Sequence, residues 1–297
     1  MALHLMLSPT GGTDVALLQA ITRAAERGGL DAVLFAGTQL DPLPLMGSMI
    51  GITRRIGLAA GWTVDFTEPF HVARVLATLD HLSYGRSAWF VEMFDTDRLL
   101  PLIGKPREAE AIATYCERAG EFIAVVKALW DSWEDEAFAL DKATGMFVDP
   151  DRVNPINHAG RFFTVRGPLN LPRPPQGTPP LIMRDPEDAA ARRFVAKHAD
   201  IVLTGRGTTQ RCDELRELAA GREIRVLADC VAPDELTERL RDCPCDGINL
   251  VTDDVEYLLE AVIPQARSDG LLRPAYAGTT LREHFRLSRP RSQFAVS

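Results

Sequence analysis

The chain has 297 residues, a formal net charge of −8 and a sequence pI of about 5.3. This acidic balance disfavours binding to nucleic acids and to anionic membrane surfaces, because both attract basic proteins. Hydrophobic residues make up 46% and charged residues 25%, as in an ordinary globular enzyme, and no stretch reaches the ~18 apolar residues of a membrane span.

The N-terminal segment of the chain is a short apolar run without the basic start of a signal peptide. We therefore interpret it as a first strand and expect a soluble, cytoplasmic protein. The five cysteines and six histidines show no spacing typical of metal ligands. We expect no metal site, and cysteines that stay reduced.

Short apolar segments then alternate with amphipathic segments along the chain. Strands are predicted at residues 2–8, 32–36, 57–63, 87–94, 180–183, 200–204, 224–228 and 247–251. Helices are predicted at residues 14–29, 42–56, 69–82, 108–133, 186–198, 209–220, 233–242 and 255–266. Alternation of this kind requires a parallel sheet with helical crossovers, and eight repeats favour a closed (β/α)8 barrel, also called a TIM barrel.

Two segments depart from the alternation. Residues 134–179 form an irregular excursion, rich in Pro, Gly and Asp, with a hairpin strand predicted at 161–166. Residues 271–297 are expected to form a polar tail that wraps the surface. The whole chain, 1–297, is predicted to be a single domain. Active sites of such barrels lie at the carboxyl ends of the strands, so the residues that follow each strand are the candidates for function.

Several long motifs carry a resemblance to a known family. They are TEPFHVARVLATLDHLSYGR (67–86), DKATGMFVDPDRVNPINHAGRFFTVRGPLNLPRPPQGTPPLI (141–182) and VIPQARSDGLLRPAYAGTTLREHFRL (262–287). They resemble the nitrilotriacetate monooxygenase component A branch of the bacterial-luciferase-like flavin monooxygenases. The resemblance implies a TIM barrel, a homodimer, and the use of reduced FMN supplied by a separate flavin reductase. The flavin and O2 would then oxidise a small-molecule organic substrate, and the protein would supply binding and orientation.

The phosphate-binding turn of that family is changed in this chain. Relatives carry a Gly-Ser-Ser turn at the start of the helix after the fifth strand, whereas Pro186, Glu187 and Asp188 stand here. Asp185 and Pro186 are predicted to be the N-cap and first residue of this helix. At a separation of about 4 Å, the repulsion between each carboxylate and one phosphate charge would cost roughly 1–4 kcal/mol. Arg184 would offset part of this repulsion if it points inward.

Other positions that the resemblance assigns to the flavin also differ. Gly37 replaces an aspartate, and Phe90 replaces an asparagine beside the flavin ring, while Thr63 keeps a hydroxyl and Tyr115 lies near a tyrosine that helps hold the phosphate. The chain is also short, because the family's long insertion after the seventh strand is missing.

The pocket of the predicted barrel has few candidate residues. His71 is a weak catalytic candidate, and a packing role for it is equally plausible. The expected substrate pocket is lined by Trp62, Asp65, Phe66 and Phe94. Two functions remain open at this point: a flavin-dependent monooxygenase, or a non-catalytic barrel that has lost FMN and serves as a binding or partner subunit.

Overall fold

The computed structural model describes residues 2–10, 12–37, 39–93, 111–205 and 207–294. The chain divides into two compact units. Unit 1 comprises residues 1–62, 86–92 and 180–288, and unit 2 comprises residues 63–85, 93–179 and 289–297. The single domain expected over the whole chain stays a prediction, and each unit is described by itself.

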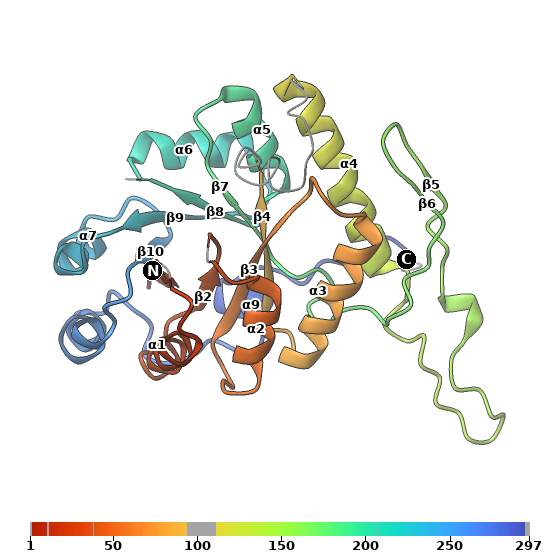
Figure 1. Cartoon of the computed structure of the whole chain (residues 1–297), viewed down its shortest axis with the longest axis horizontal. Helices are drawn as coiled ribbons and strands as arrows, with labels where there is room; N and C mark the ends of the chain where they lie inside the picture. Colours follow the sequence, from red (N-terminus) through yellow and green to blue (C-terminus); the bar gives the residue numbers. More distant parts are fainter. Residues whose placement is uncertain (1, 11, 38, 94–110, 206, 295–297) are drawn as a thin grey trace. The chain divides into compact units, whose positions relative to one another are not determined.

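Unit 1 contains a closed barrel of parallel strands, which confirms the predicted fold class (Figure 1). Around the barrel the described strands follow the order β1-β10-β9-β8-β7-β4-β3-β2. Their bounds are β1 His4–Ser8, β2 Ala32–Phe35, β3 Gly57–Thr63, β4 Ser87–Glu92, β7 Leu181–Arg184, β8 Ile201–Thr204, β9 Arg225–Cys230 and β10 Gly247–Val251. Their apolar residues are nearly all buried, as expected for strands with both faces covered.

The helices of unit 1 alternate with these strands, and α1, α2, α5 and α6 lie on the outside of the ring of strands (Figure 1). Most of them start at an Asp or Thr whose side chain accepts a bond from the first turn, as Asp14 and Thr208 do. Their bounds are α1 Val15–Arg27, α2 Pro42–Ile50, α5 Ala189–His198, α6 Thr209–Leu218, η3 Pro233–Glu235, α7 Leu236–Arg241, η4 Leu258–Val262, α8 Ile263–Ser268 and α9 Leu281–His284.

Part of the C-terminal tail inserts into the barrel core. Leu281, Phe285 and Leu287 are buried and pack with inward-facing strand residues. The expectation of a polar, surface-wrapping tail is therefore wrong for this part. Leu281 and Phe285 lie four residues apart, so they share one helical face that the average polarity of the tail conceals. Ion pairing fixes α9 further, because Arg282 Nη2 lies 3.1 Å from Asp200 Oδ2.

His284 on α9 makes the stability of the fold depend on pH. Its side chain is fully buried, and its Nδ1 lies 3.4 Å from the Asp31 carbonyl oxygen. Burial, helped by the positive charge of Arg273, lowers the pKa of His284 from 6.5 to about 4. The folded protein thus binds this proton less tightly than the unfolded chain. Stability is complete above the unfolded pKa and decreases as the pH falls from about 6.5 to about 4.

We expect protonation of His284 to lower the free energy of unfolding by roughly 3 kcal/mol once the pH is below both pKa values. Urea denaturation at several pH values between 7 and 4 measures the effect. The His284→Phe variant retains an aromatic ring beside Tyr276 and should lose this part of the pH dependence. An identical pH slope in the variant and the parent protein would show that His284 is not responsible.

Unit 2 is built on two packed helices, α3 Pro69–Ser83 and α4 Ile112–Asp131. Trp130 joins them, because its Nε1 donates to the Ala73 carbonyl oxygen at 2.9 Å. The irregular excursion follows, with η2 Pro150–Arg152 and the antiparallel pair β5 His158–Ala159 and β6 Thr164–Val165.

The hairpin strand predicted at 161–166 is confirmed in part, because β6 lies within it and pairs with β5, and Glu121 holds the turn between the two strands. This carboxylate accepts bonds from His158 Nε2 at 3.0 Å and from the backbone N–H of Phe163 at 2.8 Å. Burial alone would raise the pKa of Glu121, but the bonds from His158 and from the backbone outweigh it, so the pKa lies below its usual value. A charged Glu121 therefore fixes the turn, which an analysis of local propensity does not reveal.

Candidate functional site

Residues at the carboxyl ends of the unit 1 strands can be assigned to the inside of the barrel by alternation. Met6, Leu34, Ile182 and Leu227 belong to the inner core, so residues two positions further along each strand face inward as well. Asn249 pairs in register with both Met6 and Asp229, which places it on the same face. The upper inward layer thus contains Ser8, Ala36, Gly61, Glu92, Arg184, Asp229 and Asn249.

A chain of polar side chains crosses this layer. Arg184 Nη1 donates to Asp229 Oδ2 at 2.6 Å. Asn249 Nδ2 donates to the other carboxylate oxygen of Asp229 at 2.8 Å, and Ser8 Oγ donates to Asn249 Oδ1 at 2.9 Å. Asn249 is completely buried, whereas the Arg184 side chain is 51% exposed. The inner end of the chain is therefore fixed and its outer end, Arg184, faces solvent.

Small residues make room for Glu92 on the opposite arc of the same layer. A Cβ atom at Gly61 would collide with the Glu92 carboxylate, and it would lie 3.4 Å from the Ala36 Cβ. Trp89 Nε1 donates to the Trp62 carbonyl oxygen at 3.0 Å and so joins β4 to β3. Gly61 is thus the residue that allows a carboxylate to lie at this end of the barrel.

Two of the residues predicted to contact a flavin ring also lie in unit 1. Phe90 is 8% exposed and belongs to the barrel core cluster, one inward layer below Glu92. Gly37 follows β2 with φ +65°, in the left-handed region that favours glycine. Phe90 therefore offers only an apolar surface, and Gly37 offers no side chain. Their assignment to a cofactor stays a prediction.

The start of helix α5 is occupied by the chain's own carboxylates. Asp188 is the N-cap, and its Oδ1 accepts from the backbone N–H of Ala190 at 2.8 Å and of Ala191 at 2.9 Å. The prediction of a self-capped helix start is confirmed, but the cap is not Asp185 and the helix does not begin at Pro186. The helix begins three residues later because Asp185 has other partners.

Those partners are two arginines on helices α5 and α6. Asp185 Oδ1 lies 3.1 Å from Arg192 Nε, and Asp185 Oδ2 lies 3.3 Å from Arg211 Nε. Arg192 Nη2 also donates to the carbonyl oxygens of Pro186 and Glu187. These bonds hold residues 185–187 outside the helix and pair the charges of Arg192 and Arg211 with the chain's own carboxylates.

A phosphate group does not fit this helix start. In the first turn, the N–H groups of Ala190 and Ala191 already donate to Asp188, and Pro186 has no N–H to offer a phosphate. The carboxylates of Glu187 and Asp188 would face the phosphate charge, and the guanidinium groups of Arg192 and Arg211 are already ion-paired. The residues present here therefore do not suit the phosphate of FMN.

Of the remaining predicted residues, Asp65, Phe66 and His71 line a cleft of about 410 Å³ in unit 2, whereas Trp62 belongs to unit 1. Asp65 is the hub of this cleft: its carboxylate accepts from Tyr115 Oη at 3.0 Å, from Arg118 Nη2 at 2.8 Å and from Thr63 Oγ1 at 3.1 Å. Tyr115, which the family resemblance assigns to a phosphate, is thus bonded to an internal carboxylate. His71 and Phe66 line the same cleft, and Phe94 lies outside the described residues.

Sequence reasoning missed two residues of these networks, Asn249 and Arg118, whereas Asp229 was a candidate because it follows a predicted strand. Asp229 directly follows the seventh predicted strand and Asn249 is the middle residue of the eighth, and only the register between strands shows that they meet. Arg118 lies three residues after Tyr115, so both fall on one face of α4. That spacing was the one available signal for Arg118.

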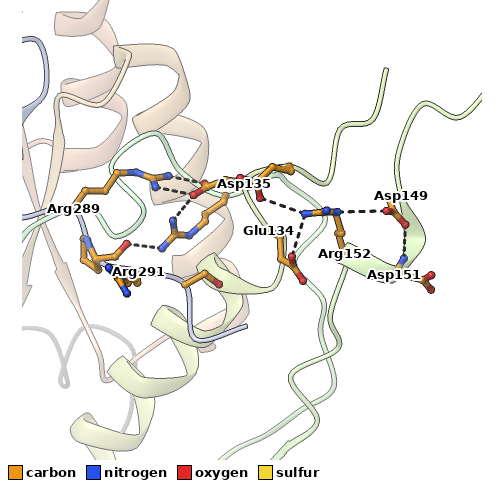
Figure 2. A pocket seen from close by; sticks show the side chains of 11 residues that line it. Glu134, Asp135, Asp149, Asp151, Arg152, Arg289 and Arg291 are labelled. Atoms are coloured by element: carbon orange, nitrogen blue, oxygen red, sulfur yellow. Dashed lines mark hydrogen bonds and ion pairs between the residues drawn. The ribbon is translucent and has the colours of Figure 1, made fainter. Parts of the chain in front are cut away.

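A second cleft in unit 2, of about 670 Å³, is lined by acidic residues and arginines (Figure 2). Its charges are largely paired with one another. Arg289 binds both carboxylate oxygens of Asp135, at 2.6 and 2.8 Å, and Arg152 lies between Glu134 and Asp149. We therefore interpret this cleft as a structural network rather than a binding site.

Two cysteines differ from the sequence expectation of reduced thiols. Cys212 on α6 and Cys245 before β10 are joined by a disulfide, while Cys116, Cys230 and Cys243 take part in no disulfide. The pair is 33 residues apart in sequence, and its two members meet because neighbouring βα units lie side by side. Nothing in the residue spacing predicted this pairing.

In the described part of the chain, no helix has the length and apolar character that crossing a bilayer requires.

Comparison with known proteins identifies the family of this barrel. Residues 3–231 match the family model of the luciferase-like monooxygenases. The chain belongs to the luciferase-like monooxygenase family. Its fold agrees with this assignment, since it superimposes on a long-chain alkane monooxygenase with a TM-score of 0.84 at 22% sequence identity, over 96% of each chain. The family members to which it is similar are oxidoreductases, so the enzyme class predicted from sequence is confirmed.

The relatives differ in how much of their length this chain spans. It is 34% identical over 286 residues to a subunit of the pristinamycin IIA synthase of Streptomyces pristinaespiralis, a match that covers 93% of this chain and 90% of that protein. It is 27% identical over 400 positions to N-acetyl-S-(2-succino)cysteine monooxygenase of Bacillus subtilis, with the same coverage. That alignment is longer than the 297 residues of this chain, so the chain lacks segments that the relative has.

Other relatives are matched only in part. For dibenzothiophene-sulfone monooxygenase of Rhodococcus erythropolis and nitrilotriacetate monooxygenase component A of Aminobacter aminovorans, the match covers 36% and 49% of the relative. The chain therefore spans less than half the length of these relatives.

Proposed function

We propose that this chain works in a two-component flavin-dependent monooxygenase that oxidises a small organic substrate. In this proposal a separate flavin reductase supplies reduced FMN, and O2 is the oxidant. The observation that carries the proposal is the family match over residues 3–231 on a closed (β/α)8 barrel. A flavin supplies the oxygen chemistry in such enzymes, and the protein supplies binding and orientation.

The residues of unit 1 form a layer of polar side chains above an apolar core. Phe90 and the core beneath it exclude water from the inside of the barrel. Above this apolar core, Asp229 and Asn249 fix Arg184 in one direction, so the layer can bind and orient a polar group. In unit 2, Asp65 holds Tyr115 and Arg118 around the cleft that His71 lines. A catalytic role for His71 and a substrate-lining role for Trp62, Asp65 and Phe66 remain part of this proposal.

A second candidate function is that of a partner subunit, in which a longer luciferase-like chain holds the flavin. Two observations favour it. At the start of α5 the N–H groups of Ala190 and Ala191 already donate to Asp188, and the described arginines Arg192 and Arg211 are ion-paired. A relative that this chain matches almost end to end is named as one subunit of a synthase. The first candidate predicts a homodimer that binds FMN, whereas the second predicts pairing with a different, longer chain.

Titration of the purified chain with oxidised and reduced FMN separates the two candidates. Saturable binding in the micromolar range would support the first candidate, because the chain would then hold the flavin by itself. Absence of binding at millimolar FMN would contradict it and favour the partner subunit. Light scattering of the same sample adds the oligomeric state, which should be a dimer for the first candidate.

A further inference from the structure

We propose that Arg184 binds a carboxylate group of the ligand at the carboxyl end of the barrel. This inference deepens the proposed function, on which it rests, by naming a chemical class for the substrate. The site consists of Arg184 together with Asp229, Asn249 and Ser8, which hold it in place. The start of α5 is a separate feature, where Asp188 already occupies the N–H groups.

Arg184 is positioned by residues from three other strands. Ser8 on β1 bonds to Asn249 on β10, Asn249 bonds to Asp229 on β9, and Asp229 bonds to Arg184 on β7. Because Asn249 is fully buried, the direction of the Asp229 carboxylate is set from within the barrel. A guanidinium fixed in this way loses less conformational entropy when a ligand binds than a free surface arginine would.

The Arg184 guanidinium keeps donors available for a ligand. Among the described residues its one ion pair is with Asp229, through Nη1, and its side chain is 51% exposed. A guanidinium has five N–H donors in one plane, so the bond from Nη1 to Asp229 leaves the edge formed by Nε and Nη2 for a ligand. Two coplanar acceptor oxygens match that edge, which is the geometry of a carboxylate.

The charges around Arg184 favour a singly charged group over phosphate. Asp229 is its ion-pair partner, Asp185 is the next residue along the chain, and Glu92 occupies the neighbouring inward position when the β4–β7 register is continued. The carboxylates of Asp229 and Glu92 repel a bound anion, whereas the charge of Asp185 is paired with Arg192 and Arg211. The repulsion doubles for a dianion. A carboxylate keeps the two-point contact with the smaller repulsion.

Binding of a small dicarboxylate to the unmodified chain tests this assignment without any flavin. The probe is succinate, followed by calorimetry and by the side-chain NMR signal of Arg184, with the neutral diamide succinamide and inorganic phosphate as comparison ligands. We expect saturable succinate binding, with no binding of succinamide and weaker binding of phosphate. In Arg184→Gln the affinity for succinate should fall about tenfold or more, and Arg184→Lys, which retains the charge without the planar fork, should lie between.

Arg216→Gln is the matched control. Arg216 is also an exposed arginine paired with an aspartate, Asp246, but that aspartate precedes β10 at the opposite end of the barrel. The change in net charge is the same, and succinate affinity should not change. Equal losses in both variants, no loss in Arg184→Gln, no succinate binding, or tighter binding of phosphate than of succinate would each overturn the assignment. Succinate binding in a chain that binds no FMN would leave this inference standing while the first candidate function fails.

Discussion

Replacing Glu187 and Asp188 together by serine should tighten FMN binding by about tenfold or more, because two carboxylates would no longer face the phosphate. Serine also caps helices well, so α5 should still begin at residue 189 with little change in stability. Riboflavin has no phosphate, and its affinity should be the same in the variant and the parent chain. Fluorescence titration with both flavins measures the effect.

The control for this variant carries the same change in charge at a distance from the turn. Asp213→Ser with Glu217→Ser removes two exposed carboxylates from α6 and should leave FMN affinity unchanged. If FMN affinity rises equally in both double variants, the effect comes from the overall charge of the protein. If it rises in neither, the carboxylates at the start of α5 are not what opposes the phosphate.

Replacing Arg173 by alanine should destabilise the folded chain by roughly 3 to 5 kcal/mol, because it leaves a buried carboxylate unpaired. Arg173 and Asp131 are both largely buried, and Arg173 Nε lies 2.9 Å from Asp131 Oδ1. The same guanidinium donates to Asp135 at 3.0 Å and to the Pro290 carbonyl oxygen at 2.8 Å. It therefore joins the end of α4 to the last described residues of unit 2.

Chemical denaturation of this variant should be compared with that of Arg161→Ala. Arg161 is ion-paired with Glu117 at 2.7 Å, but both side chains are more than half exposed, so its loss should cost less than about 1 kcal/mol. Similar midpoints for the two variants would contradict a structural role for the buried pair. Such a role gives a physical reason for one part of the family motif, since Arg173 and Gln176 both lie in it and Gln176 binds Asp80.

The barrel was predictable because its signal is local. Each βα unit shows its own spacing of apolar residues, so a strand such as residues 57–63 or 247–251 is recognised with the bounds that the structure has. The insertion of Leu281 and Phe285 into the core was not predictable from the composition of the tail, because the apolar face of α9 spans only a few residues within a polar segment.

The candidate site was predictable only in part, for a related reason. The acidic residues at the start of α5 are adjacent in sequence, so their effect on a phosphate follows from the sequence. The choice of Asp188 over Asp185 as the cap does not, since it depends on Arg192 and on Arg211 from the next helix. The Arg184 network requires the register of β1, β9 and β10, which is a property of the closed barrel.

Although this chain belongs to the luciferase-like monooxygenase family, the described residues at the start of α5 do not suit a flavin phosphate. The most direct test compares the dissociation constants of FMN and riboflavin for the unmodified chain under identical conditions. We predict that FMN binds no more tightly than riboflavin, because the phosphate gains no N–H donors and meets two carboxylates. FMN binding that is tighter by about tenfold or more would show that the phosphate is held and would contradict this conclusion.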